Sequence, residues 1–219
     1  MRQSYILCNR TIPATRIFKD LGITINDRLS FDEHVSLTVN KARRMLGMIS
    51  RSFSQRDIHA SINLYKTYVR SKLEFGNILW QPYTQRNIKL VESVQRRMTK
   101  RLPGFGHLPY RERLYNLKIQ SLQARRIRYH LIFLYKAVHG YVDLDIFKLF
   151  DVVTNSSTRG NHFRLYTSRC HHNYRNYFFT GPAGIAQYWN MLSDAEINVE
   201  SVSKFKVVIE RLFQRLDIW

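Results

Sequence analysis

The strongest constraint on the fold is a helical repeat of apolar side chains in residues 85–140. Apolar residues recur there every three or four positions, the spacing that places them on one face of an α-helix. Leu102–Gly106, which contains one proline and two glycines, divides the stretch. We therefore expect two or three helices that each bury one face. The apolar positions are Ile88, Val91, Val94, Met98, Ala124, Ile127, Leu131, Leu134 and Val138.

The other faces of these expected helices are strongly basic. Between Arg86 and Lys136 the sequence has thirteen lysines and arginines, but its only acidic residues are Glu92 and Glu112, so the net charge is +11. A packed helical segment with one face this positive favours a polyanionic partner.

The composition of the whole chain supports the same interpretation. The 219 residues have a formal net charge of +19, a pI near 10.3 and a hydrophobic content of 44%. That content suits a globular protein with one large core or two small ones. Aromatic residues make up 13% and lie among arginines, which favours nucleic acid over an anionic membrane because bases stack on aromatic rings. The alternative is a basic surface without a bound partner.

Several protein classes are disfavoured. Two cysteines, Cys8 and Cys170, are too few for a disulfide scaffold and suit a reducing compartment. The apolar run within residues 1–10 is too short for a signal peptide, and no apolar stretch is long enough to span a bilayer. We therefore expect no membrane partner.

Two helices are predicted before the basic stretch. The first extends from about residue 30 to 53 and begins with a Ser30–Glu33 capping-box sequence. The second begins near residue 54 or 55 and extends to about Trp80, shortly before a proline. Upstream, residues 5–7 and 23–25 have the β-prone composition of short strands.

The composition changes after residue 150. Residues 154–158 are expected to form a linker, followed by strand-like runs at 163–167 and 174–179 and a last helix from Ser201 to about Leu216. Cys170-His171-His172 is the only metal-like cluster in the sequence. Four ligands at zinc-finger spacing are absent, so we expect a basic loop with a free thiol rather than a metal site.

The order of residues along the basic stretch resembles a known family. Its ordered motifs resemble the C-terminal part (palm end, thumb and tail) of reverse transcriptases from jockey-like non-LTR retrotransposons, and the match covers nearly the whole chain. The sequence departs from the family pattern at Ser193, where a proline is typical, and at Gly181-Pro182, where a basic residue is frequent. The matching motifs are Lys19-Asp20-Leu21-Gly22-Ile23, Tyr65-x-x-Tyr68-Val69-Arg70, Leu73-Glu74, Glu92-x-x-Gln95-Arg96-Arg97-x-Thr99-Lys100, Tyr110-x-x-Arg113-Leu114, Leu122-x-x-Arg125-Arg126-x-Arg128, Tyr135-Lys136, Thr158-Arg159-Gly160 and Trp189-Asn190-x-Leu192.

The resemblance implies a mainly α fold with a thumb-like basic helical bundle at 30–150. A short β remnant of the palm is expected at 1–29, and a small mixed α/β tail at 151–219. Template–primer RNA and DNA are the implied partners, held through the backbone and the minor groove without reading of sequence, in a nuclear or cytoplasmic ribonucleoprotein. Leu21 and Gly22 match the primer grip. The expected nucleic-acid contacts are Arg96, Arg97, Lys100, Arg101, Arg113, Arg125, Arg126 and Arg128.

The resemblance does not extend to catalysis. Polymerisation in this family requires paired aspartates that hold two magnesium ions in the palm, upstream of the Leu21-Gly22 block. The sequence has no Asp-Asp pair, and its first acidic residue is Asp20. We therefore expect a truncated RNA-directed DNA polymerase segment with no catalytic residue, no cofactor of its own and no primer extension. Leu102–Gly106 lacks the Lys-Ser/Thr ending of a P-loop, which argues against nucleotide hydrolysis.

Two other interpretations stay open. The chain is a fragment of a decayed element without activity, or it is an adopted protein-interaction scaffold whose basic face meets an acidic partner. A chain that lacks its palm is expected to expose apolar surface near residues 5–25 and on the helix predicted at 30–53.

Overall fold

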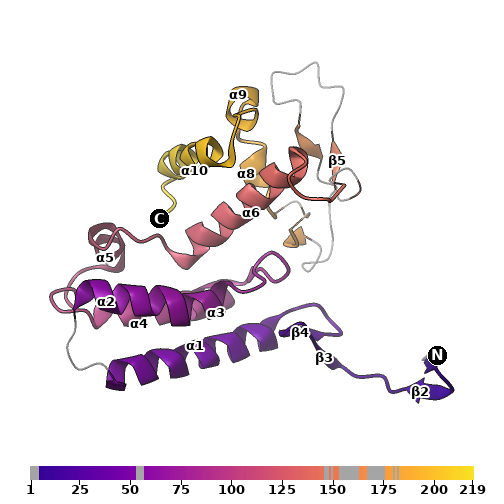
Figure 1. Cartoon of the computed structure of the whole chain (residues 1–219), viewed down its shortest axis with the longest axis horizontal. Coiled ribbons are helices and arrows are strands. Elements are labelled where there is room, and N and C mark those ends of the chain that lie inside the picture. Colours follow the sequence, from indigo (N-terminus) through magenta and orange to yellow (C-terminus); the bar gives the residue numbers. More distant parts are fainter. Residues whose placement is uncertain are drawn as a thin grey trace.

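The computed structural model of the chain describes residues 5–52, 57–145, 148, 150–152, 163–166, 176–179, 181 and 183–219. It is mainly helical, which confirms the predicted fold class, and the described strands pair into three two-stranded antiparallel sheets. Figure 1 shows the long helices in successive layers. In order across the molecule they are α1 (Asp32–Ser52), α4 (Gln85–Lys100), α6 (Leu122–Val138) and α10 (Val202–Leu216).

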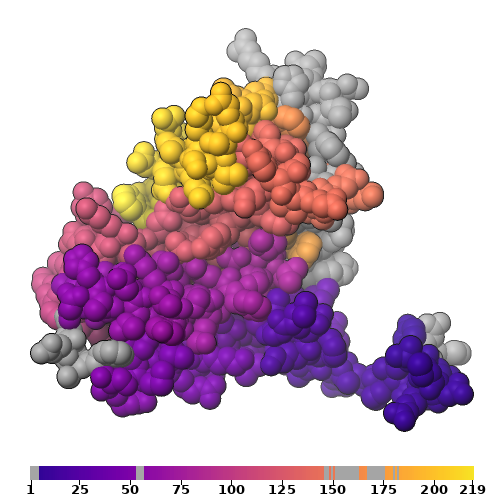
Figure 2. All heavy atoms as spheres, viewed as in Figure 1, coloured from indigo at the N-terminus to yellow at the C-terminus, as the bar shows by residue number. Residues whose placement is uncertain are grey.

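Two β-hairpins precede α1 and confirm the strands predicted at 5–7 and 23–25. β1 (Tyr5–Leu7) pairs with β2 (Arg10–Ile12), and β3 (Ile17–Asp20) pairs with β4 (Ile23–Asn26). Both hairpins turn through two residues of positive φ, the type I′ geometry that matches the twist of paired strands. The β1–β2 hairpin lies apart from the body of the molecule in Figure 2, and all of its strand residues are exposed.

The capping box predicted at the start of α1 does not form. The hydroxyl of Ser30 accepts a hydrogen bond from Nδ2 of Asn26 at 2.8 Å instead of capping the amide of Glu33. The reason is the local backbone, which takes positive φ at both Leu29 and Phe31 and so directs Ser30 away from the helix. The helix then extends to Ser52, close to its predicted end.

The second predicted helix is continuous but contains three segments: α2 (Ile58–Leu64), the π-helix η1 (Tyr65–Arg70) and α3 (Ser71–Glu74). Asp57 caps its start, because the carboxylate accepts from the amide of Ala60 at 2.7 Å. The helix ends at Glu74 rather than near Trp80. Phe75 is extended and Gly76 has a left-handed φ of 64°, so the α-helical hydrogen bonds stop there.

α4 packs beside α1 in the same direction. Asn87 donates to the carboxylate of Asp32 near the beginning of both helices, and Nη1 of Arg101 donates to the hydroxyl of Ser50 at 3.2 Å near their ends. After α4 the chain turns through residues 102–109 into the short α5 (Tyr110–Asn116), and Ser121 then caps α6 by accepting from the amide of Ala124 at 3.1 Å.

The described part of the tail contains β5 (Asp151–Val152), β6 (Leu165–Tyr166), α8 (Ala186–Trp189), α9 (Asp194–Ile197) and the predicted last helix, α10. Trp189 is fully buried and its Nε1 donates to the carbonyl oxygen of Phe163 at 2.9 Å. β6 lies within the strand-like run predicted at 163–167, whereas the described residues 176–179 of the run predicted at 174–179 form no strand. The predicted linker at 154–158 and the Cys170–His172 cluster lie outside the described residues.

The buried apolar side chains form two cores that meet within α6. Leu122 belongs to a core built from β4, α1, the α2–η1–α3 helix and α4. Ala124 and the residues after it in α6 belong to a second core, with α8, α9 and α10. The packing therefore divides the chain inside α6, whereas the boundaries predicted at 29/30 and 150/151 follow composition. None of the described helices is long and apolar enough to cross a membrane.

Candidate nucleic-acid interface

The eight predicted nucleic-acid contacts separate into two groups of four. Arg96, Arg97, Lys100 and Arg101 are all exposed at the C-terminal end of α4. The other four cations (Arg113, Arg125, Arg126 and Arg128) are buried or held by acidic side chains of neighbouring elements.

The phase of α4 explains why its cations are exposed. Successive residues of an α-helix are rotated by about 100°, so Arg96, Lys100, Arg97 and Arg101 lie within an arc of about 140°. The buried residues of α4 occupy the rest of the circumference, and they include its only carboxylate, Glu92, which is 6% exposed. No acidic side chain therefore stands on the exposed face of this helix.

The same face continues to the beginning of α4. Arg86 and Lys89 are exposed and share the helical phase of the four cations that follow. The α4 basic stripe is thus composed of Arg86, Lys89, Arg96, Arg97, Lys100 and Arg101. Arg86 and Lys89 are not among the eight predicted contacts, although helical phase alone identifies them.

Arg43 of α1 borders the stripe. Its Nη2 donates to the hydroxyl of Ser93 at 2.9 Å, which places an exposed guanidinium of the neighbouring helix beside the centre of the stripe. Nothing in the local sequence of α1 identifies this residue, because the contact depends on how the two helices pack.

A buried hydrogen-bond network fixes the inner face of α4. Oε1 of Glu92 accepts from the hydroxyl of Tyr110 and from the amide of Leu122 at 3.1 Å. Gln95 accepts from the hydroxyl of Tyr65 at 2.8 Å and donates to the hydroxyl of Tyr110 at 3.0 Å. Burial, together with the neighbouring Glu92 carboxylate, raises the pKa of Tyr110, so its hydroxyl stays protonated and remains a donor.

Arg113 supports the stripe from inside rather than contacting phosphate. Its side chain is 7% exposed, and Nη1 donates to the carbonyl oxygen of Arg96 at 2.9 Å and to the hydroxyl of Thr99 at 3.1 Å. Burial lowers its pKa. Arg96 itself lies over the ring of Tyr110, 4.2 Å from its centroid. The prediction for Arg113 is therefore corrected, because a guanidinium enclosed beneath α4 is inaccessible to a duplex.

Arg126 and Arg125 of α6 are also structural. Arg126 is 3% exposed, and burial lowers its pKa to about 10. The nearby Glu92 and Glu74 carboxylates favour its charged form. Arg125 forms a bidentate pair with Glu74, from Nε to Oε1 and from Nη2 to Oε2 at 3.0 Å. The prediction that these two residues contact phosphate is corrected, because Arg126 is buried away from the surface and the Arg125 guanidinium is already paired with Glu74.

Arg128 pairs with Glu210 of α10 and is likewise not expected to contact phosphate. This ion pair joins α6 to the tail, so the third arginine of the Leu122–Arg128 motif also serves packing. Its pKa is lowered by burial first and by the neighbouring Arg125 second.

The structure places Leu21 and Gly22 at the tip of the β3–β4 hairpin. Leu21 is 87% exposed with a φ of 44°, and Gly22 has a φ of 91°. The hairpin is anchored at the beginning of α1, where the amide of Thr24 donates to Nδ1 of His34 at 3.1 Å. Because α1 has 21 residues and is about 30 Å long, this tip is far from the cations at the end of α4. The primer-grip assignment stays a prediction.

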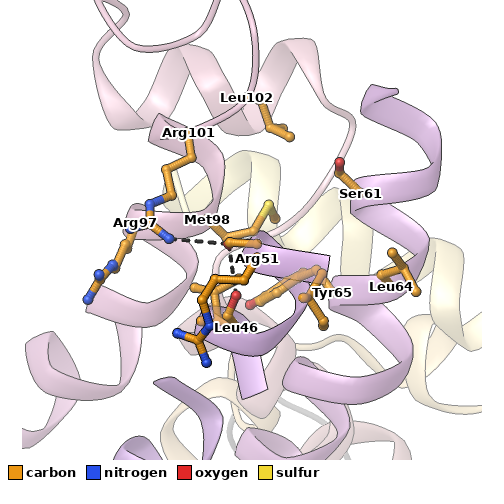
Figure 3. A pocket seen from close by; sticks show the side chains of 12 residues that line it. Leu46, Arg51, Ser61, Leu64, Tyr65, Arg97, Met98, Arg101 and Leu102 are labelled. Atoms are coloured by element: carbon orange, nitrogen blue, oxygen red, sulfur yellow. Dashed lines mark hydrogen bonds between the residues drawn. The ribbon is translucent and has the colours of Figure 1, made fainter. Parts of the chain in front are cut away.

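A pocket of about 470 Å³ opens at the end of the basic stripe, between the last turns of α1 and α4 and the side of α2. In Figure 3, Arg51, Arg97 and Arg101 gather on one side, and Ser61 and Leu64 lie on the other. The described residues contain no group of three or more His, Cys, Asp or Glu side chains that could hold a metal ion.

A Caenorhabditis elegans protein named "Uncharacterized protein B0403.1" is 29% identical over 112 residues, which is 49% of this chain and 56% of that relative. The chain thus spans about half the length of the curated relative that it matches. No family model matches the chain. No solved structure matches it significantly.

Proposed function

We propose that the chain binds the sugar–phosphate backbone of a nucleic-acid duplex through the α4 basic stripe. The observation that carries the proposal is an exposed helix face with six cations and no carboxylate, while the one acid of α4 is turned into the core. Within the described part of the chain, Arg96, Arg97 and Lys100 form no ion pair, so phosphate can replace water around them.

The dimensions of the stripe suit a duplex. The 16 residues of α4 extend over about 24 Å, a length that spans several phosphates of one strand. Lysine and arginine on a straight helix contact phosphates without reading bases, so affinity should depend on salt much more than on sequence.

The sequence resemblance gives this activity a biological context. We infer that the chain is the thumb-like end of a non-LTR reverse transcriptase and that its duplex is a template paired with a primer, in a nuclear or cytoplasmic ribonucleoprotein. The magnesium ions of such an enzyme would be held by an Asp-Asp turn that this sequence lacks, so we assign no catalytic step to its residues. Primer extension by the purified chain would contradict this inference.

The test is fluorescence anisotropy with an RNA–DNA hybrid and a matched DNA duplex at two salt concentrations. For the full chain we expect similar affinities for unrelated sequences and a steep loss of affinity with salt. The triple variant Arg96→Gln, Arg97→Gln, Lys100→Gln should reduce the slope of log affinity against log salt by about 2 to 3.

A matched control removes the same charge elsewhere. Lys204, Lys206 and Arg211 are exposed on α10, and their replacement by glutamine should leave the slope nearly unchanged. If both triple variants reduce affinity equally, the protein binds through its general charge and the stripe is not a site.

A second candidate, the protein-interaction scaffold, is favoured by the N-terminal hairpins. Tyr5, Ile6, Leu7 and Phe18 are all more than 60% exposed, and exposed apolar side chains that lie together often form a protein-contact surface. Binding that does not change with salt would favour this scaffold over the basic stripe. A product that aggregates and lacks a cooperative unfolding transition would favour the decayed fragment.

A further inference from the structure

The pocket at the end of the α4 basic stripe combines cationic and apolar walls. Arg51, in the last turn of α1, and Arg97 of α4 are exposed at its rim. The floor is apolar, because Leu46, Met98 and Leu102 are at least 94% buried and line the cavity. The pocket thus offers two chemically different surfaces within one concave site.

The guanidinium of Arg51 lies beside the backbone of its own helix. A Cβ built at Gly47 would be 3.6 Å from Nη1 of Arg51, an ordinary van der Waals distance. This arrangement holds the charge close to the opening instead of extended into solvent. In Figure 3, Arg51 and Arg97 lie on the same side of the pocket, opposite Ser61 and Leu64.

The volume restricts the ligand. About 470 Å³ lies within the range of small-ligand pockets, roughly 300 to 1,000 Å³, and accommodates one nucleotide but no duplex. A phosphate has its complement in Arg51 and Arg97, and a flat base has its complement in the aliphatic floor. The thioether of Met98 adapts readily to a planar ring.

We propose that this pocket holds one unpaired nucleotide of a single-stranded end that extends from the duplex bound to the stripe. The proposal rests on the proposed function, since the stripe delivers the strand to the pocket. Arg97 belongs to both sites, so the backbone passes directly from the stripe to the pocket rim. The base is unpaired, because the hydrogen-bonding edge of a paired base is covered by its partner strand.

The experiment compares three labelled duplexes with identical paired regions: blunt, with a three-nucleotide single-stranded end, and with the same end made abasic. We expect the natural end to increase the affinity of the full chain by about tenfold over the blunt duplex. The abasic end carries the same phosphates without bases, so it should add little affinity over the blunt duplex. Equal affinities for the natural and abasic ends would overturn the proposal.

A pocket-filling variant provides a second test on the protein. Ser61→Phe places a ring in the cavity without altering the charge. The variant should lose the tenfold higher affinity for the duplex with the natural single-stranded end, while its affinity for the blunt duplex is unchanged. The control Asn63→Phe adds the same ring to an exposed position of α2 that does not line the pocket. If a folded Ser61→Phe variant still binds the duplex with the natural end more tightly than the blunt duplex, the proposal is contradicted.

The two proposals fail in different ways. If no duplex binds, both are overturned. If the blunt duplex binds with the expected salt dependence and the natural end adds nothing, the stripe stands and the pocket assignment is wrong. If only the natural end binds and the double variant Arg96→Gln, Lys100→Gln, which leaves Arg97 in place, has no effect, the stripe is wrong and so is the proposed delivery of the strand from the stripe to the pocket.

Discussion

Nε2 of His130 donates a hydrogen bond to the carbonyl oxygen of Asn77 at 3.0 Å in the interior between α6 and the residues after α3. A carbonyl oxygen can only accept, so this ring nitrogen carries the proton of the neutral imidazole. Burial, with a smaller contribution from the nearby Arg126 and against the opposing effect of the hydrogen bond to Asn77, lowers the pKa of His130 from 6.5 to about 4.

This pKa predicts loss of stability in mild acid. Above pH 6.5 both states hold His130 neutral and the full stability is present. Between pH 6.5 and about 4 the unfolded chain binds a proton that the folded chain excludes, so the free energy of unfolding should fall by about 3 kcal/mol. Urea unfolding at pH 7.5 and pH 5 should show about 2 kcal/mol of this change, because pH 5 lies only about 1.5 units below the pKa of the unfolded chain.

His130→Gln is the matched variant for the acid effect. A glutamine amide can still donate to Asn77 and does not titrate, so the variant should lose most of the pH dependence in this window. His34 contributes in the same direction, because burial and Lys41 lower its pKa as well. An unchanged pH profile in His130→Gln would assign the effect to other groups.

Arg125 and Arg97 should have opposite phenotypes. Arg125→Ala removes the bidentate partner of the Glu74 side chain, which is 12% exposed and keeps Arg70 at 3.7 Å as a second cation, and should lower the free energy of unfolding by about 2 kcal/mol. Arg97→Ala should change stability by less than about 0.5 kcal/mol. Conversely, only Arg97→Ala should weaken duplex binding by the folded protein. If Arg125→Ala keeps the unfolding free energy of the natural chain and binds the duplex more weakly, Arg125 contacts nucleic acid after all.

Glu92 should be far more important for stability than Glu112, although the two are the only acids of the basic segment. Glu92→Gln retains the acceptor for Tyr110 and Leu122 but removes the nearby negative charge that favours the charged form of Arg126. We expect a loss of about 3 kcal/mol, against less than about 0.5 kcal/mol for the exposed Glu112→Gln. Equal unfolding midpoints would show that Arg126 does not depend on Glu92.

The β3–β4 turn should tolerate only residues that accept positive φ. Leu21→Asn should raise the free energy of unfolding by about 1 kcal/mol, since asparagine adopts this conformation more readily than leucine. Gly22→Ala, at a φ of 91°, should lower it by a similar amount. Thermal unfolding of the two variants tests both signs, and destabilisation by Leu21→Asn would show that the leucine side chain is held by a contact.

Much of the helical framework was predictable because apolar periodicity directly reports the buried face of a helix. α1 and α10 begin and end close to their predicted limits, and α4, α5 and α6 are the helices expected within residues 85–140. The predicted end of the second helix near Trp80 is wrong, because Gly76 has a left-handed φ that the apolar pattern does not reveal. The π-helix η1 has no sequence signal of its own.

The candidate site was less predictable, and the reason is physical. Charge counts treat Arg97 and Arg126 alike, whereas their roles depend on the burial of each side chain. Helical phase could have separated the outer face of α4 from the inner one. It could not have identified the partner of Arg125, because Glu74 lies 51 residues away in the sequence.

The network beneath α4 separates the side chains that hold the helix from part of its outer charge. Glu92 and Gln95 hold the helix in place from below, and Arg97 and Lys100 on its outer surface take no part in that network. A chain built this way can exchange, neutralise or reverse those outer charges over evolutionary time while its architecture stays intact. It is therefore a scaffold on which affinity for polyanions can be adjusted one residue at a time.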